Sequence, residues 1–208
     1  LAPAGWENKE IEFLIIIDEH GEFITVESRR RDKKSCQVFL VPKAARSGST
    51  PKPYLFNDTM EYTLGYSVKN AEEKSLAKLN AFIERCKDVA SRHPENIRFA
   101  AVVAFYENDG VRKVKESEQW ENLDMAKAKG SVSFLIRGDL YIVAEDSDLK
   151  SEINTEADTE EKVCLVTGQK APLIRLSSNV HLTGANMAGA SLVSFQKNSG
   201  YDSWNKDQ

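Results

Sequence analysis

Residues 11–27 read Ile11-Glu-Phe-Leu-Ile-Ile-Ile17, then Asp18-Glu-His-Gly21, then Glu22-Phe-Ile-Thr-Val-Glu27. The first segment is rich in β-branched and aromatic residues, the second has the composition of a turn, and the third alternates as a strand does. This pattern predicts a β-hairpin. Downstream, residues 37–41 predict a third strand that ends at Pro42, and residues 42–53 predict a loop. Upstream, residues 1–9 are expected to form an irregular lead-in.

Two helices are expected in the middle of the chain. Asn70 is a candidate N-cap, and apolar side chains then recur at helical spacing until His93-Pro94. They are Leu76, Leu79, Phe82, Ile83, Cys86 and Ala90. Pro94 suits the first turn of a second helix, with Ile97, Ala101, Val102 and Phe105 on one face.

Residues 131–136 and 140–143 predict a second hairpin around Arg137-Gly138-Asp139. Short strands are expected at 162–166, 173–176 and 191–195. Because strands and helices do not alternate regularly, the expected class is α+β, with antiparallel hairpins and one or two helices packed against them.

Charge is distributed unevenly along the 208 residues. The net charge is -4, yet residues 29–52 carry eight basic residues against one acid, Asp32. Residues 145–161 carry eight acids and one lysine, which predicts an acidic surface loop. A charge run is usually a solvated surface, so the basic segment has two interpretations, a solvated loop or an anion-binding surface.

The composition excludes several classes of protein. Three cysteines, Cys36, Cys86 and Cys164, are odd in number and far apart, which excludes a disulfide scaffold and a paired-cysteine metal site. They favour a reducing cytoplasm. No apolar run is long enough to span a membrane, and no secretory signal is present at the start. No cofactor and no metal are expected.

One enzymatic alternative stays open at this stage. Residues 184–189 have the spacing of a phosphate-binding loop, but Ala190-Ser191 follow where a lysine would be required. A small cytoplasmic hydrolase or nucleotide-binding enzyme could use His181 and the 181–191 loop. A third interpretation is a protein-interaction scaffold that binds neither DNA nor nucleotides.

Five segments together resemble one family. They are Ile11-Glu-Phe-Leu-Ile-Ile-Ile-Asp18-Glu-His-Gly21, Phe39-Leu-Val-Pro-Lys43, Leu55-Phe-Asn-Asp-Thr-Met-Glu-Tyr-Thr-Leu-Gly65, Cys164-Leu-Val-Thr-Gly168-Gln-Lys-Ala-Pro172-Leu-Ile-Arg-Leu176 and Gly189-Ala-Ser-Leu-Val-Ser-Phe195. In this order they resemble the large subunit of the type I-C CRISPR effector complex, Cascade.

The resemblance implies a non-catalytic subunit. Such a subunit helps to recognise the protospacer-adjacent motif in double-stranded DNA, assists opening of the duplex, and offers a docking surface for a helicase–nuclease. Guide RNA held by the other Cascade subunits reads the rest of the target. The family's subunit is longer, so residues 1–195 are expected to be its N-terminal DNA-recognition domain and 196–208 the start of a connection.

The resemblance and the charge pattern together select candidate DNA contacts. The basic cluster can supply phosphate contacts, and the loop 43–53 combines donors with a glycine that permits close approach to a groove. Ser47, just before that glycine, is implied as a base reader, with Asn57 and Thr59 next. The full set is Arg29, Arg30, Arg31, Lys33, Lys34, Lys43, Arg46, Ser47, Gly48, Ser49, Thr50, Lys52, Asn57 and Thr59.

Overall fold

The computed structural model describes residues 2–3, 5–32, 35–43, 51–68, 72–155, 161–163, 168, 170–172, 179–180 and 190–191. The chain divides into two compact units, Leu1–Glu156 and Ala157–Gln208. The expected N-terminal domain of residues 1–195 extends over both units, and that domain assignment stays a prediction.

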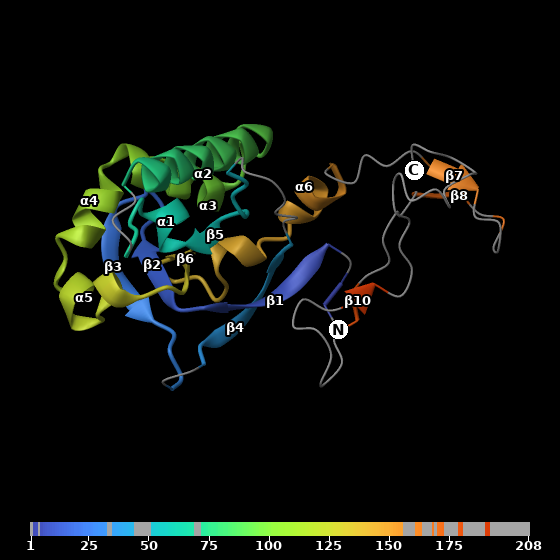
Figure 1. Cartoon of the computed structure of the whole chain (residues 1–208). Helices are drawn as coiled ribbons and strands as arrows, with labels where there is room; N and C mark the ends of the chain where they lie inside the picture. Colours follow the sequence, from blue (N-terminus) through green and yellow to red (C-terminus); the bar gives the residue numbers. More distant parts are fainter. Residues whose placement is uncertain are drawn as a thin grey trace. The chain divides into compact units, whose positions relative to one another are not determined.

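A four-stranded mixed sheet forms the centre of the first unit (Figure 1). Its strands lie in the order β3 (Phe23–Ser28), β2 (Phe13–Ile17), β6 (Ser131–Ile136) and β5 (Asn57–Thr59). The β2–β3 and β5–β6 pairs are antiparallel, and β2 and β6 are parallel. The hairpin expected over residues 11–27 is confirmed, and so is the α+β class.

Strand β2 explains the uninterrupted apolar run of the sequence. All five of its side chains are buried, and it has a neighbouring strand on each side. A strand covered on both faces needs apolar residues at every position. Each buried Ile, Leu or Phe contributes about 1.5–3 kcal/mol through removal of apolar surface from water. The run therefore marks the centre of the sheet.

The first residues form a strand, so the irregular lead-in expected there is wrong. Strand β1 (Trp6–Ile11) pairs antiparallel with β4 (Gln37–Pro42), which confirms the expected third strand. The chain passes from this two-stranded ribbon to the sheet at Glu12, whose backbone N–H donates to Ser131 at 2.8 Å. Four of the six β1 residues are polar, which hides the strand in the sequence.

Helices cover one face of the sheet. Figure 1 shows α1 (Met60–Thr63), α2 (Glu72–Arg92) and α3 (Ile97–Glu107) gathered above the strands. Helix α2 confirms the first expected helix, and its Phe82, Cys86 and Val89 are buried. The expected cap Asn70 lies outside the described residues.

Helix α3 begins later than expected. The Asn96 side chain accepts hydrogen bonds from the backbone N–H groups of Arg98 and Phe99, at 3.1 and 3.2 Å, and so caps the helix in place of Pro94. Ile97 is 64% exposed, whereas Phe99, Ala101, Val102 and Phe105 are buried. The apolar face was therefore assigned correctly except at its first position.

Three short helices that the sequence did not suggest follow α3. They are α4 (Gly110–Lys115), α5 (Glu118–Asn122) and the 3-10 helix η1 (Met125–Lys127), and the first two lie beside edge strand β3 (Figure 1). Trp120 packs edge-on against Tyr66 at 5.0 Å, and the Tyr66 hydroxyl donates to the Ala126 carbonyl. These contacts hold the segment against the sheet.

The predicted second hairpin is wrong, because its first strand forms but its second does not. Strand β6 forms as expected and Gly138 takes a φ of +95°, but residues 140–142 are not a strand and Leu140 is 99% exposed. The chain continues into the 3-10 helix η2 (Val143–Glu145). The partners of β6 are β2 and β5, which are distant in sequence, so long-range pairing overrides the local turn.

The acidic segment differs from the surface loop expected over residues 145–161. It contains helix α6 (Leu149–Thr155), and the carboxylates of Asp146 and Glu152 are buried. Glu152 accepts hydrogen bonds from Arg92 and from His93, the latter at 2.9 Å. These partners at the end of α2 compensate the burial of a charge.

The described part of the second unit consists of two small antiparallel pairs. Strand β7 (Glu161–Val163) pairs with β8 (Lys170–Pro172), and β9 (Asn179–Val180) pairs with β10 (Ala190–Ser191). The expected strand at 173–176 lies outside the described residues, as do 164–166 and 192–195. Within the described ranges, no helix is long and apolar enough to cross a membrane.

Candidate nucleic-acid interface

One end of the four-stranded sheet gathers residues from distant parts of the sequence. Strand register places the end of β3, the start of β2, the start of β6 and the end of β5 side by side, since Phe13 faces both Ser28 and Val132, and Thr59 faces Ser131. Arg29, Arg30 and Arg31 follow β3, and Lys127 and Lys129 precede β6. We call these five cations the basic end of the sheet.

An open groove of about 770 Å³ lies at the basic end, the basic groove. It is lined by Glu12, Arg30, Arg31 and Asp32 on one side and by Asp124, Lys127 and Lys129 on the other, so four cations stand among three acids. A smaller hollow of about 250 Å³ shares Lys129 and contains Thr59. The sequence-predicted residues Arg30, Arg31 and Thr59 thus lie around one short segment, residues 128–130.

Arg30 is exposed, but its guanidinium is already bound to neighbouring groups of the protein. Its guanidinium pairs with Glu12 at 2.6 Å, donates to the Leu123 carbonyl at 3.0 Å, and lies 4.9 Å from the centre of the Phe13 ring. Glu12 in turn accepts the backbone N–H of Gly130 at 2.7 Å. Arg30 therefore fastens the turn after β3 to the segment before β6.

The other members of the basic cluster differ in accessibility. Arg29 is half-buried and pairs with Glu27 at 2.6 Å. Arg31 is exposed, and its guanidinium has no ion pair within the described part of the chain. Lys33 and Lys34 lie outside the described residues.

The expected motif-reading loop leaves the far end of strand β4. Lys43 is exposed, and its backbone N–H donates to the Gly5 carbonyl at 2.8 Å. Arg46, Ser47, Gly48, Ser49 and Thr50 lie outside the described residues, and Lys52 beyond them is exposed. Six residue steps from Gln37 to Lys43 correspond to about 20 Å along an extended strand, so Lys43 is well separated from the basic end.

The third candidate region consists of Asn57 and Thr59, which differ in accessibility. Asn57 is fully buried, donating to the Leu55 carbonyl and accepting from Lys9 Nζ, both at 2.9 Å. Its amide is occupied in the core and does not reach the surface. Thr59 is half-buried beside the smaller hollow. Of the two, only Thr59 reaches the surface near the basic end, where it lies opposite Ser131.

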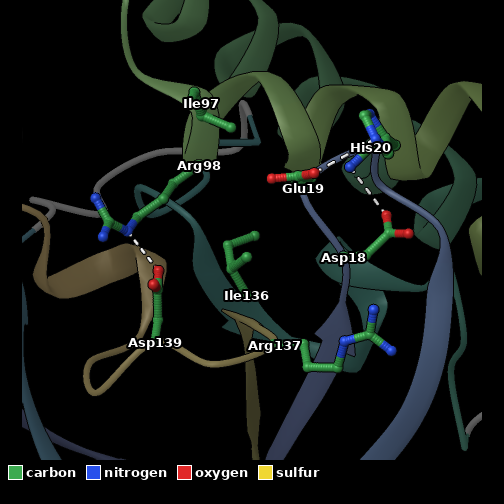
Figure 2. Close-up of a pocket in the computed structure, with 8 residues that line it drawn as sticks. All are labelled: Asp18, Glu19, His20, Ile97, Arg98, Ile136, Arg137 and Asp139. Atoms are coloured by element: carbon green, nitrogen blue, oxygen red, sulfur yellow. Dashed lines mark hydrogen bonds and ion pairs between the residues drawn. The ribbon is translucent and has the colours of Figure 1, made fainter.

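A second cavity of about 530 Å³ opens at the opposite end of the sheet (Figure 2). Asp18 follows β2 and Arg137 follows β6, while Arg98 from α3 pairs with Asp139 at 2.6 Å. Hydrogen bonds from the backbone N–H groups of Glu22 and His20 lower the pKa of Asp18, and Arg137 adds to the effect. In Figure 2 Arg137 extends away from the Arg98–Asp139 pair.

The histidines of the described residues lie apart from one another and do not belong to a metal-binding cluster. In that part of the chain no three His, Cys, Asp or Glu side chains converge to hold a metal ion. His93 is bound to Glu152, and His20 lies 3.5 Å from Glu19 on the surface. His181 and residues 184–189, the site of the alternative enzyme, lie outside the described residues.

The sequence analysis missed Lys127 and Lys129. They stand in a mixed-charge segment, Asn122-Leu-Asp-Met-Ala-Lys-Ala-Lys129, with no basic run to mark them. Only the parallel pairing of β6 with β2 brings them beside the turn after β3. A weak pattern, two lysines just before an apolar strand, was the one local indication.

The fold and this geometry define an α+β protein with a groove that carries four cations at one end of its central sheet. The chain belongs to the CRISPR-associated protein (Cas_Csd1) family, whose model matches residues 1–208. The family recognised by resemblance is thereby confirmed, and the chain is a CRISPR-associated Cascade subunit with other subunits as partners. Comparison with curated proteins finds no match.

Proposed function

We propose that this protein is a non-catalytic DNA-binding subunit that recognises the protospacer-adjacent motif in duplex DNA and assists R-loop formation. The observation that carries the proposal is the basic end of the sheet in a protein whose net charge is -4. A local excess of cations on an acidic protein favours a polyanionic ligand at that place.

Two surfaces divide the work in this proposal. Cations at the basic end contact phosphates and fix the position of the duplex, which carries no sequence information. The loop 43–53, about 20 Å away along β4, contacts base edges through Ser47 and its neighbours. The guide RNA, held by other subunits, then pairs with the opened strand, and a helicase–nuclease is recruited afterwards in the cytoplasm.

Salt-dependent DNA binding tests this function. Fluorescence anisotropy of a labelled 20-base-pair duplex is expected to give a Kd that weakens steeply between 50 and 200 mM salt. Thermal unfolding with ATP, GTP and NADH is expected to give no shift of Tm. Nucleotide stabilisation without duplex binding would favour the alternative enzyme, and neither response would favour a protein-interaction scaffold.

A selection experiment with the assembled complex tests motif recognition and identifies the motif. A target flanked by randomised base pairs is bound, washed and sequenced. Enrichment of one flanking motif is expected. Uniform recovery of all flanks from a complex that binds the target would contradict motif recognition.

A further inference from the structure

The basic groove has two walls that are about ninety residues apart in the sequence. One wall consists of Arg30, Arg31 and Asp32, which follow β3, and Arg30 forms a β-bridge with Cys36. The other is the segment from Asp124 to Gly130 that leads into β6. A groove between two loops keeps its shape only when something holds the loops together.

Glu12 and Arg30 supply that connection at the base of the groove. Arg30 bonds to Glu12 and to the Leu123 carbonyl, and Glu12 bonds to the backbone of Gly130. The Glu12 side chain is 13% exposed, so this pair is partly shielded from solvent. Both walls are thereby fixed relative to the start of β2.

Three cations remain at the rim above this pair. Arg31 and Lys129 are exposed, and neither has an ion-pair partner within the described ranges. Lys127 pairs with Asp124 at 2.9 Å, but both side chains are largely exposed. An exposed pair of this kind contributes little, so Lys127 can exchange Asp124 for another anion.

The lining also distinguishes between nucleic acids. Among the described residues, no aromatic side chain lines the basic groove. Proteins that bind single strands hold unpaired bases against aromatic rings, whereas a stacked duplex presents its phosphates and needs only cations. Asp32 also lines the groove, and its carboxylate accepts the Ser35 N–H and hydroxyl at 2.9 and 2.7 Å.

We propose that the basic groove binds the phosphodiester backbone of duplex DNA through Arg31, Lys127 and Lys129, with the Glu12–Arg30 pair as a positioning element that does not touch the ligand. This rests on the proposed function and assigns its non-specific anchor to one residue of the basic run, Arg31, and to two lysines outside it. In this proposal Lys127 and Lys129, and not Arg30, are the principal phosphate contacts.

The test is a double variant, Lys127→Gln with Lys129→Gln, measured against labelled duplex across a salt series. Loss of two phosphate contacts should lower the log–log salt slope by about 1.8 and raise Kd on the order of 50-fold at 0.1 M salt. The matched control is Lys87→Gln with Lys113→Gln. These lysines pair with Glu107 and Glu22, away from the groove, and the control should keep the slope of the unaltered chain.

Each outcome decides a separate question. If the unaltered chain binds no duplex at 50 mM salt, the proposed function and the groove both fail. If it binds and the groove variant binds equally well, the groove fails and the function stands. If the variant loses affinity for single-stranded RNA but not for duplex DNA, the groove binds RNA and the duplex assignment is overturned.

Discussion

Arg30 shows that an arginine in a basic run can be unavailable for phosphate, because its guanidinium is already hydrogen-bonded within the protein. It stands in a run of three arginines, which suggests a phosphate contact, yet its guanidinium is bound to Glu12 and to the Leu123 carbonyl. Arg31, one position further, is exposed as well but has no ion-pair partner among the described residues. The sequence cannot distinguish them, because a charge run does not reveal which member meets a distant carboxylate.

We therefore expect the charge-neutral double variant Glu12→Gln with Arg30→Gln to keep the salt slope of duplex binding. It should lower the free energy of unfolding by about 1–2 kcal/mol, since a partly exposed, charge-assisted network is lost. Urea unfolding and anisotropy measure the two effects. As a control, Arg31→Gln should lower the slope by about 0.9 without loss of stability. A slope lowered by 0.9 in the double variant would make Arg30 a phosphate contact.

At the scale of elements, local patterns predicted the components and long-range pairing decided their arrangement. The run Phe13–Ile17 and the helical spacing of Phe82 and Cys86 were sufficient for β2 and α2. They could not reveal that β6 pairs in parallel with β2, because nothing in residues 131–136 specifies a partner about 120 residues away. The basic groove follows from that pairing, so only its Arg30–Arg31 side was predictable.

The corrected second hairpin makes a direct prediction. Phe134 is fully buried, with the rings of Phe105 and Tyr106 at 5.4 and 5.9 Å, so Phe134→Ala should cost about 3–5 kcal/mol of stability. Leu140 is 99% exposed, so Leu140→Ala should change stability by less than about 0.5 kcal/mol. Chemical denaturation measures both. A large loss of stability for Leu140→Ala would instead support the predicted second strand at residues 140–143.

Helix α6 depends on the ionised form of Glu152. Burial opposes that form, but hydrogen bonds from Arg92 and His93 together outweigh it and lower the pKa of Glu152 below its usual 4.5. An acid whose pKa is lower in the folded state stabilises the fold above the unfolded pKa. That contribution is lost as the pH falls through the folded pKa.

Glu152→Gln should accordingly cost about 1–3 kcal/mol at pH 7. The difference from the unaltered chain should begin to shrink as the pH falls below about 4.5, the pKa in the unfolded chain, and should be lost as the pH falls through the lower folded pKa. Urea unfolding at pH 7, 5 and 3.5 follows this convergence. Lys127→Gln, whose pair with Asp124 is exposed, is a control expected to cost less than about 1 kcal/mol. A difference that stays constant down to pH 3.5 would exclude Glu152 ionisation as the cause.

At the scale of the whole molecule, the proposed function uses two places along one ribbon, the basic end and the loop that begins at Lys43. The basic end and Lys43 lie about 20 Å apart, over half of the roughly 34 Å that one turn of DNA occupies. A duplex lying along the β1–β4 ribbon can meet both. Affinity and selectivity are then carried by separate residues, and substitutions at the two places should have different consequences.

Gly48→Val in the loop 43–53 tests that separation in the assembled complex. A branched side chain should block close approach to the groove of the DNA and weaken binding to the selected motif by at least 1–3 kcal/mol, the usual cost of losing a base contact. Ser47→Ala should lose about the same through a missing hydrogen bond. Binding to a duplex with a scrambled motif should stay nearly constant for both variants, because it depends on phosphate contacts at the basic end. The Lys127→Gln, Lys129→Gln variant should instead bind both duplexes more weakly, by the same factor.

If Gly48→Val weakened binding to both duplexes equally, the loop would be only an additional phosphate contact. If it weakened binding to neither duplex, Thr59 would be the next candidate for motif recognition.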